Sequence, residues 1–260
     1  MAKPDRAPLT RRWLRAVALP AVLLLALEVY ARGWGQGSDS LAPPTAAAVA
    51  FGRLVADGSL WEATSFTLRA ALTGLALGSV LGVAAGVLLG SSRRAAAWSL
   101  LSVELLRPMP SVALIPLALL VFGFGLTMES SVVAFATFWP MLVMTQAAVR
   151  QIEPRWLEVA AALGLSRWHR LQKIVLPSVL ARWFVALRLG LAIALVVAVT
   201  VEIAANPSGM GYALILAQQS LDPAQMLAWL AWIGALGYAL NALAGVAEVR
   251  LARRFGEVAT

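Results

Sequence analysis

The 260-residue sequence contains no cysteine and few charged residues. Without cysteine, the chain has neither a disulfide framework nor thiolate chemistry. Charged residues make up 13% of the sequence, whereas a soluble domain normally carries roughly a quarter. Hydrophobic residues make up 60%, which is more apolar surface than a soluble domain of this length would hide. The composition therefore predicts a membrane protein.

Histidine and lysine are also scarce, and their scarcity excludes two kinds of site. His169 is the only histidine, and it lies in a basic segment, so metal or acid–base chemistry has no constellation of residues. Lys3 and Lys173 are the only lysines, and neither lies in a G-x-x-x-x-G-K-[ST] phosphate-binding loop. We therefore expect no catalytic residue, no metal site and no bound cofactor, so the chain is not expected to be an enzyme.

Long apolar runs are abundant, and runs of roughly 20 apolar residues can cross a bilayer as helices. The sequence predicts an all-α, polytopic membrane protein with about six transmembrane helices. The predicted spans are 14–30, 66–89, 111–126, 131–149, 183–204 and 226–246. The third is the weakest, because prolines interrupt it. The first has a basic start like a secretory signal, but no small-x-small cleavage site follows, so we expect an uncleaved span.

Basic residues alternate along the connections between these spans. Arginines concentrate in the N-terminal tail, in connections 90–110 and 150–182, and in the C-terminal tail, whereas the other connections hold few. Because cytoplasmic segments carry the excess of Lys and Arg, both termini and the 150–182 connection are predicted to be cytoplasmic. This distribution also accounts for the net charge of +8 without a nucleic-acid partner.

The predicted organisation has four parts. A cytoplasmic tail and the first span occupy 1–35. An external segment with a short interfacial helix occupies 36–64. A core of five spans, which includes the cytoplasmic connection 150–182, occupies 65–250, and a cytoplasmic tail occupies 251–260.

The 150–182 connection contains the most informative motif. It reads Glu158-Val-Ala-Ala-Ala-Leu-Gly164, then nine residues, then Ile174-Val-Leu-Pro177. This pattern resembles the EAA–G–I-LP loop of the membrane subunits of bacterial ABC importers, with Val159 where the family usually has alanine. The resemblance implies that this loop docks on a separate ATPase. The coupling-loop residues it assigns are Glu158, Ala160, Ala161, Ala162, Leu163, Gly164, Ile174, Leu176 and Pro177.

Local signals in this loop predict an elbow of two short helices. Pro154 suits the first helical position, and the residues up to 163 favour helix. Gly164 is placed to end that helix in a left-handed conformation, and Ser166 can cap a second helix over 167–174. The small apolar residues 160–163 are expected to face water together, which is typical of a docking surface.

A second pattern, Arg107-Pro-Met-Pro110 followed by Pro116 and Phe122-Gly-Phe-Gly125, looks like the nitrate/sulfonate/taurine branch of importer permeases. The signature residues are Arg107, Pro108, Pro110 and Pro116. The resemblance implies a type I ABC importer permease fold in a bacterial inner membrane. It also implies a small anionic or zwitterionic nutrient, such as nitrate, an alkanesulfonate or taurine, with a heterocyclic vitamin precursor as an alternative.

The same resemblance implies the partners. Two copies of an ABC ATPase would use ATP and Mg²⁺, a second permease copy would complete the pathway in contact with membrane lipid, and a periplasmic or lipid-anchored binding protein would deliver substrate. An ion-coupled secondary transporter is the alternative from another class. It predicts inverted repeats and several intramembrane acids, and the sequence shows no clear repeat.

Small residues recur every fourth position in two spans, where they let a neighbouring backbone approach closely. The second span carries Gly74, Gly78, Gly82, Gly86 and Gly90, and the fifth carries Ala186, Gly190, Ala194 and Ala198 before Glu202. The glycines are either a seam between two permease copies or tight packing within one subunit, which is the simpler interpretation.

Charged residues near the outer ends of two spans are candidates for a pathway or gate. Arg69 and Glu202 fall at comparable depth, so an ion pair between them is plausible, with either a gating or a structural role. The nearby segment Asn206-Pro-Ser-Gly209-Met210-Gly211-Tyr212 resembles the G-L-G-Y turn of importer permeases, and otherwise reads as a plain tight turn. The pathway or gate candidates are Arg69, Glu202, Asn206, Gly209, Met210 and Gly211.

Overall fold

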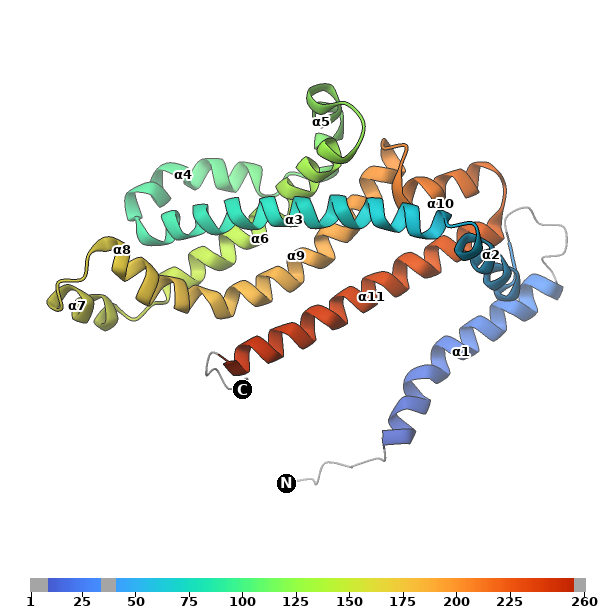
Figure 1. Cartoon of the computed structure of the whole chain (residues 1–260), viewed down its shortest axis with the longest axis horizontal. Coiled ribbons are helices and arrows are strands. Elements are labelled where there is room, and N and C mark those ends of the chain that lie inside the picture. The colour runs from blue at the N-terminus through green and yellow to red at the C-terminus, as the bar shows by residue number, and fades with distance from the viewer. Residues whose placement is uncertain (1–8, 34–40, 255–260) are drawn as a thin grey trace. The chain divides into compact units, whose positions relative to one another are not determined.

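The computed structural model describes residues 9–33 and 41–254, in which all regular structure is helical (Figure 1). The all-α prediction is therefore confirmed. The helices are α1 (Leu9–Gly33), α2 (Pro44–Ala56), α3 (Ser59–Ser91), α4 (Arg93–Leu106), the 3₁₀ turn η1 (Ser111–Leu114), α5 (Ile115–Phe122), α6 (Leu126–Arg150), α7 (Pro154–Ala162), α8 (Arg167–Arg170), the π-helical η2 (Leu171–Val175), α9 (Leu176–Ala204), α10 (Gly209–Gln219) and α11 (Pro223–Arg254).

Parts of the predicted tails and of the external segment, namely 1–8, 34–40 and 255–260, lie outside the described residues. The chain forms two compact units. Unit 1 comprises Met1–Leu60 and Leu214–Trp232, and unit 2 comprises Trp61–Ala213 and Ile233–Thr260. A late segment thus joins the N-terminal part in unit 1, a grouping that the linear division into four parts does not include.

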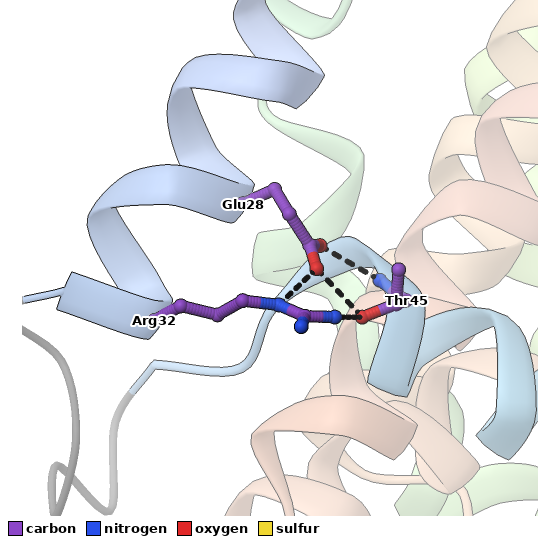
Figure 2. Close-up of polar contacts among 3 residues, drawn as sticks. All are labelled: Glu28, Arg32 and Thr45. Carbon is purple, nitrogen blue, oxygen red and sulfur yellow. Dashed lines mark hydrogen bonds and ion pairs between the residues drawn. The ribbon is translucent and has the colours of Figure 1, made fainter.

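In unit 1, a polar contact fixes α1 against the start of α2, the predicted interfacial helix (Figure 2). The carboxylate of Glu28 accepts hydrogen bonds from the backbone N–H of Thr45 at 3.0 Å and from its hydroxyl at 2.8 Å. Arg32 donates to both partners, at 2.5 Å and 3.0 Å. Glu28 therefore places a negative charge at the N-terminus of α2, where the free N–H groups and the helix dipole favour it.

The first segment of unit 1 includes a short turn at residues 57–59 that leads into α3. The carboxylate of Asp57 accepts from the hydroxyl of Ser59 at 2.6 Å and from its N–H at 2.9 Å. These two hydrogen bonds hold the pKa of Asp57 below its usual range.

Four helical segments among the described residues are long and apolar enough to cross a membrane: α3, α6, the Arg182–Ala204 part of α9 and the Pro223–Arg250 part of α11. They correspond to the second, fourth, fifth and sixth predicted spans. The first predicted span falls within the 25-residue helix α1. The multi-pass helical architecture is therefore as predicted, although the described residues contain four such segments, or five if a bent pair of helices counts as one span, rather than six.

The third predicted span, 111–126, is not a continuous helix. It forms η1 and the eight-residue α5, and α5 ends at Gly123, whose φ is +70°. Gly125, with φ +116°, then precedes α6. Helix α4 and the segment Ser111–Phe122 are together long and apolar enough to cross a membrane, but the chain bends by 89° between them. The pair therefore forms either a broken span or a re-entrant loop. Pro108 and Pro110 stand at that bend, because proline cannot continue an α-helix.

The glycine stripe of α3 packs against α6 within unit 2. A Cβ built on Gly74 would lie 2.5 Å from Cβ of Val133, and one on Gly90 would lie 2.6 Å from Cβ of Val149. The three glycines between them, Gly78, Gly82 and Gly86, meet α6 equally closely. Such separations leave no room for a side chain, so the stripe serves packing inside one subunit, and the simpler interpretation is confirmed.

The alanine stripe of α9 lies in the core of the same unit. Ala186, Ala194 and Ala198 are fully buried in one cluster with Met141 of α6. A Cβ on Gly190 would stand 2.9 Å from the side-chain tips of Leu75 and Met141. Small residues thus let α9 pack closely against α6. Glu202, the polar residue that ends the stripe, is consequently buried as well.

Candidate functional site

The predicted elbow is present between α6 and α9. Helix α7 begins at Pro154, and Gly164 adopts φ +67°. The N–H of Leu165 donates to the carbonyl oxygen of Ala160 at 3.0 Å. This six-to-one hydrogen bond around a left-handed glycine is a Schellman motif, which satisfies a carbonyl at the helix end. The prediction for Gly164 is confirmed.

The second half of the elbow begins at Ser166, as expected. Its hydroxyl accepts from the N–H of His169 at 3.3 Å and contacts Nδ1 of the same ring at 2.7 Å. Helix α8 lasts a single turn and continues as the π-helical η2 into α9, rather than as one α-helix over 167–174. His169 is therefore part of a helix cap.

The base of the elbow is tied across its two ends. Arg182, early in α9, donates a hydrogen bond to the side-chain oxygen of Gln151, just after α6. Val149 and Val175 are buried in one small cluster, with Ile152 packed against it. These contacts join α6 and α9 where the elbow leaves them.

Among the described side chains of the elbow, four large apolar ones are exposed: Trp156, Val159, Leu163 and Trp168. We call these four residues the elbow face; Leu163 is the most accessible, at 71%. Glu158 and Ala162 are also exposed. Ala160 differs from expectation, because it is 1% exposed and lies inside the protein rather than in the water-facing strip. The side chain of Ala161 lies outside the described part.

The last three coupling-loop positions lie at the entry to α9. Ile174 is half-buried, and Leu176 and Pro177, the first two residues of α9, are exposed. Pro177 fits there because the first turn of a helix needs no N–H donor at that position.

At the other end of α9, six polar groups from four helices (α3, α6, α9 and α10) and a loop form a buried cluster. The side-chain amide of Asn206 donates from Nδ2 to Oε2 of Glu129 at 2.6 Å. The N–H of Gly211 donates to Oε2 of Glu202 at 2.7 Å, and the carboxyl groups of Glu129 and Glu202 contact each other. Thr67 of α3 accepts from the N–H of Met210 at 3.0 Å. We call this the carboxyl cluster.

Burial in the carboxyl cluster is nearly complete: Glu129 is 0% exposed and Glu202 and Asn206 are 1% exposed. Oε1 of each glutamate and Oδ1 of Asn206 have no hydrogen-bond donor in the described part of the chain. Two glycines complete the enclosure. Gly209, at φ +89°, lies directly against the carboxyl group of Glu202, and a Cβ on Gly211 would lie 2.8 Å from Cβ of Glu202. The predicted tight turn is therefore a packed connection that starts α10.

Arg69 does not belong to the carboxyl cluster. It is exposed, and no ion pair with Glu202 occurs among the described residues. The proposed pairing of Arg69 with Glu202 is wrong, because Thr67, two residues earlier on α3, faces the cluster instead. A step of two residues turns a helix by about 200°, so Arg69 points away.

Sequence reasoning missed Glu129 and Thr67. Glu129 was assigned to a connection because the fourth span was predicted to begin at residue 131, whereas α6 begins at Leu126. An acid three residues into an apolar helix, four after a Gly-x-Gly, was the available signal. Arg188, also within a predicted span, has ordinary structural partners: it donates to Oδ1 of Asn241 at 3.0 Å and pairs with Glu248 at 3.3 Å.

The Arg107–Pro116 signature forms the sharp bend described above. Arg107 ends α4, Pro108 follows it, and Pro110 precedes η1, with Pro116 in the first turn of α5. Arg107 also lines a cavity of about 460 Å³ between this bend, α6 and α9.

Residues 74–256 match the family model described as binding-protein-dependent transport system inner membrane component. The chain is 31% identical over 209 residues to a protein of Bacillus subtilis provisionally described as an aliphatic sulfonates transport permease, covering 80% of this chain and 75% of that one. It is 32% identical to the riboflavin transport system permease protein of Chloroflexus aurantiacus, covering 92% of this chain and 90% of that one. It is 28% identical to the taurine transport system permease protein of Escherichia coli, covering 78% of this chain and 74% of that one.

Solved structures show the same fold. A chain of an amino acid ABC transporter superposes with a TM-score of 0.62 at 17% identity, covering 78% of this chain and 98% of that one. A chain of a methionine ABC transporter in an inward-facing conformation superposes with a TM-score of 0.61 at 20% identity, covering 76% and 98%. The expected importer permease fold is thereby confirmed.

Proposed function

Since this chain belongs to the family of binding-protein-dependent transport system inner membrane components, we propose that it forms the substrate pathway of an ATP-driven importer and receives mechanical work through the elbow face. The permease is a multi-pass membrane protein and not an enzyme. ATP and Mg²⁺ are used by a separate ATPase subunit that docks on the elbow.

The exposure of the elbow face is the observation that supports this docking site. Trp156, Leu163 and Trp168 are each more than half exposed, on a connection where they have no lipid-spanning role to serve. Large apolar groups gathered on a polar connection are typical of a protein interface, and tryptophan is enriched at binding hot spots. The glycine cap and the Arg182–Gln151 tie make the elbow stiff enough to move as a unit.

The complete assembly in this proposal contains two permease copies and two ATPase subunits in a bacterial inner membrane. Both termini and the elbow lie on the cytoplasmic side, where ATP is available, as the distribution of arginines favours. A binding protein, either periplasmic or anchored by lipid, delivers the substrate on the opposite side.

The transported substrate in this proposal is a small sulfonate, either an anionic alkanesulfonate or zwitterionic taurine. Relatives described as sulfonate and taurine permeases support this class. A heterocyclic substrate is the second candidate, because the riboflavin permease of Chloroflexus aurantiacus matches over a larger share of this chain. Uptake of radiolabelled butanesulfonate, taurine, nitrate and riboflavin by the reconstituted transporter separates these candidates. Uptake of riboflavin alone would overturn the sulfonate assignment.

Docking is tested by replacing one residue of the elbow face. Leu163→Asn should lower co-purification of the permease with its ATPase at least tenfold, because it removes an apolar contact from the centre of the interface. Leu221→Asn is the matched control, since Leu221 is 67% exposed at the turn between α10 and α11 and its positive φ suits asparagine. The control should co-purify normally.

A second variant tests the elbow's shape. Gly164→Pro is incompatible with φ +67° and should abolish ATPase association while the chain still inserts in the membrane. If both Leu163→Asn and Gly164→Pro retain full ATPase association and ATP-dependent uptake, the elbow is not the docking site.

A further inference from the structure

The cavity beside Arg107 has a composition that selects its ligand. Its volume of about 460 Å³ is in the range of small-molecule sites. Apart from Arg107 and Ser111, its lining is apolar or aromatic and includes Phe135, Trp139 and Leu189. No carboxylate lines it, so the only formal charge facing the space is positive.

The guanidinium of Arg107 is available to a ligand. Arg107 is exposed, and none of the ion pairs in the described ranges 9–33 and 41–254 includes it. An arginine with free donors recognises planar or tetrahedral oxyanions through two parallel hydrogen bonds. Since the surrounding wall is apolar, an anion bound there exchanges water for a strong charge-assisted contact.

An aromatic side chain lies in the same wall. Trp139 is 9% exposed and lines the cavity. Its ring is held edge-to-face by Phe135 and Phe138, at centroid distances of 5.6 Å and 4.9 Å. A ring fixed in this way offers an apolar surface on which the alkyl or aryl part of a ligand can pack.

We propose that this cavity is a transport-path subsite for an organic monoanion with an apolar body, whose charged head lies at Arg107 and whose alkyl or aryl part packs on Phe135 and Trp139. This inference deepens the proposed function and rests on it. An alkanesulfonate fits this chemistry. Taurine fits less well, because its ammonium group would have no carboxylate partner. Nitrate lacks the apolar body.

The absence of cysteine allows a direct test of the cavity. In the purified full-length chain in nanodiscs, Ser111→Cys places one thiol in the cavity wall. The reaction of that thiol is followed with the anionic reagent sulfonatoethyl methanethiosulfonate and with its cationic trimethylammonium analogue. One unit charge about 4 Å away changes such a rate roughly fivefold even in water. The anionic-to-cationic rate ratio should therefore fall at least about fivefold when Arg107→Gln is added, and Arg107→Lys should preserve it.

Ligand occupancy is read from protection in the same assay. Butanesulfonate should slow labelling of Ser111→Cys, whereas the neutral analogue butyl methyl sulfone, taurine and nitrate at the same concentration should protect at least threefold less. Arg107→Gln should remove the protection. Ser220→Cys, exposed in the turn before α11, is the control site and should show no response to Arg107.

Three results overturn the proposal: a rate ratio that Arg107→Gln leaves unchanged, equal protection by butanesulfonate and its sulfone, or equal protection by nitrate. If Ser111→Cys does not fold, Met144→Cys provides a second thiol in the same lining. Labelling requires neither ATP nor partners, so its outcome is independent of the ATPase co-purification that tests the proposed function.

Discussion

Nδ2 of Asn206 lies 2.6 Å from Oε2 of Glu129, although the two residues are 77 positions apart in the sequence. This hydrogen bond ties the loop after α9 to the first turn of α6. It also gives the buried carboxyl group of Glu129 a side-chain donor. The loop that leads into α10 is therefore held by chemistry inside the protein.

Replacing Asn206 by leucine removes that donor and keeps the side-chain volume. Asn206→Leu should lower the free energy of unfolding by about 1–3 kcal/mol, because Glu129 is left buried with an unsatisfied oxygen. Thermal unfolding in detergent micelles measures the change. Asn241→Leu is the control: Asn241 accepts from the exposed Arg188, so its loss should cost less than about 1 kcal/mol. Equal losses for the two variants would contradict the role of Asn206.

Double-mutant cycles should report coupling within the carboxyl cluster and none to Arg69. The effects of Glu129→Gln and Glu202→Gln on stability should be non-additive by about 0.5–3 kcal/mol, since the two groups are in contact. Either glutamine introduces a side-chain amide that can donate to the neighbouring carboxyl oxygen. Once one glutamine has done so, the second substitution has fewer unpaired oxygens to satisfy, so its effect is smaller. Arg69→Gln combined with Glu202→Gln should be additive within about 0.5 kcal/mol. Strong coupling in the Arg69 cycle would show that the two side chains meet.

Gly209 has both a positive φ and a close contact with Glu202, and a variant at Gly58, which has only the positive φ, separates the two effects. Gly209→Ala must accept φ +89° and also displace the carboxyl group of Glu202. Gly58→Ala faces almost the same φ, +83°, with nothing within 4 Å. The control should lose about 1–2 kcal/mol of stability from backbone conformation alone, and Gly209→Ala should lose more. Chemical denaturation of both variants tests this, and equal losses would mean that Glu202 moves aside freely.

The contact between α3 and α6 can be tested with a second pair of glycine variants. A Cβ on Gly82 would lie 2.6 Å from the carbonyl oxygen of Phe138 and 2.7 Å from Cβ of Met141, so Gly82→Ala should cost about 1–3 kcal/mol through overpacking. Gly234→Ala in α11 adds a methyl group to open space. It should leave stability unchanged or raise it by up to about 1 kcal/mol. Retention of the Gly82→Ala variant at wild-type stability would exclude the close packing of α3 on α6.

Features that depend on neighbours in the sequence were predicted well. Pro154, Gly164 and Ser166 each act on the backbone within a few residues, and all three occur where the local rules place them. The glycines of α3 share a face because of helix geometry alone, so their role in close packing followed from their spacing. What remained open was the partner of that face, which only the position of α6 identifies.

Features that depend on distant residues were missed or wrong. Ala160 was expected in an exposed strip, but it is covered within the fold. Arg69 was matched to Glu202 by depth, but depth does not specify which face of α3 turns toward α9. Glu129 was placed outside a span, because the start of α6 at Leu126 follows from backbone conformations at Gly123 and Gly125 that composition does not reveal.

Composition, hydropathy and the local signals of the elbow were sufficient to predict a multi-pass helical membrane protein with an elbow, because burial in lipid and helix capping act through composition and short-range contacts. The permease was predicted from the resemblance of the motif at 158–177 to a known family. Tertiary packing alone decided that Glu129 and Glu202 meet and that Arg107 faces an aromatic cavity. Each of these depends on how α6 and α9 approach each other, and the small residues on α9 permit that approach without specifying which polar groups it brings together.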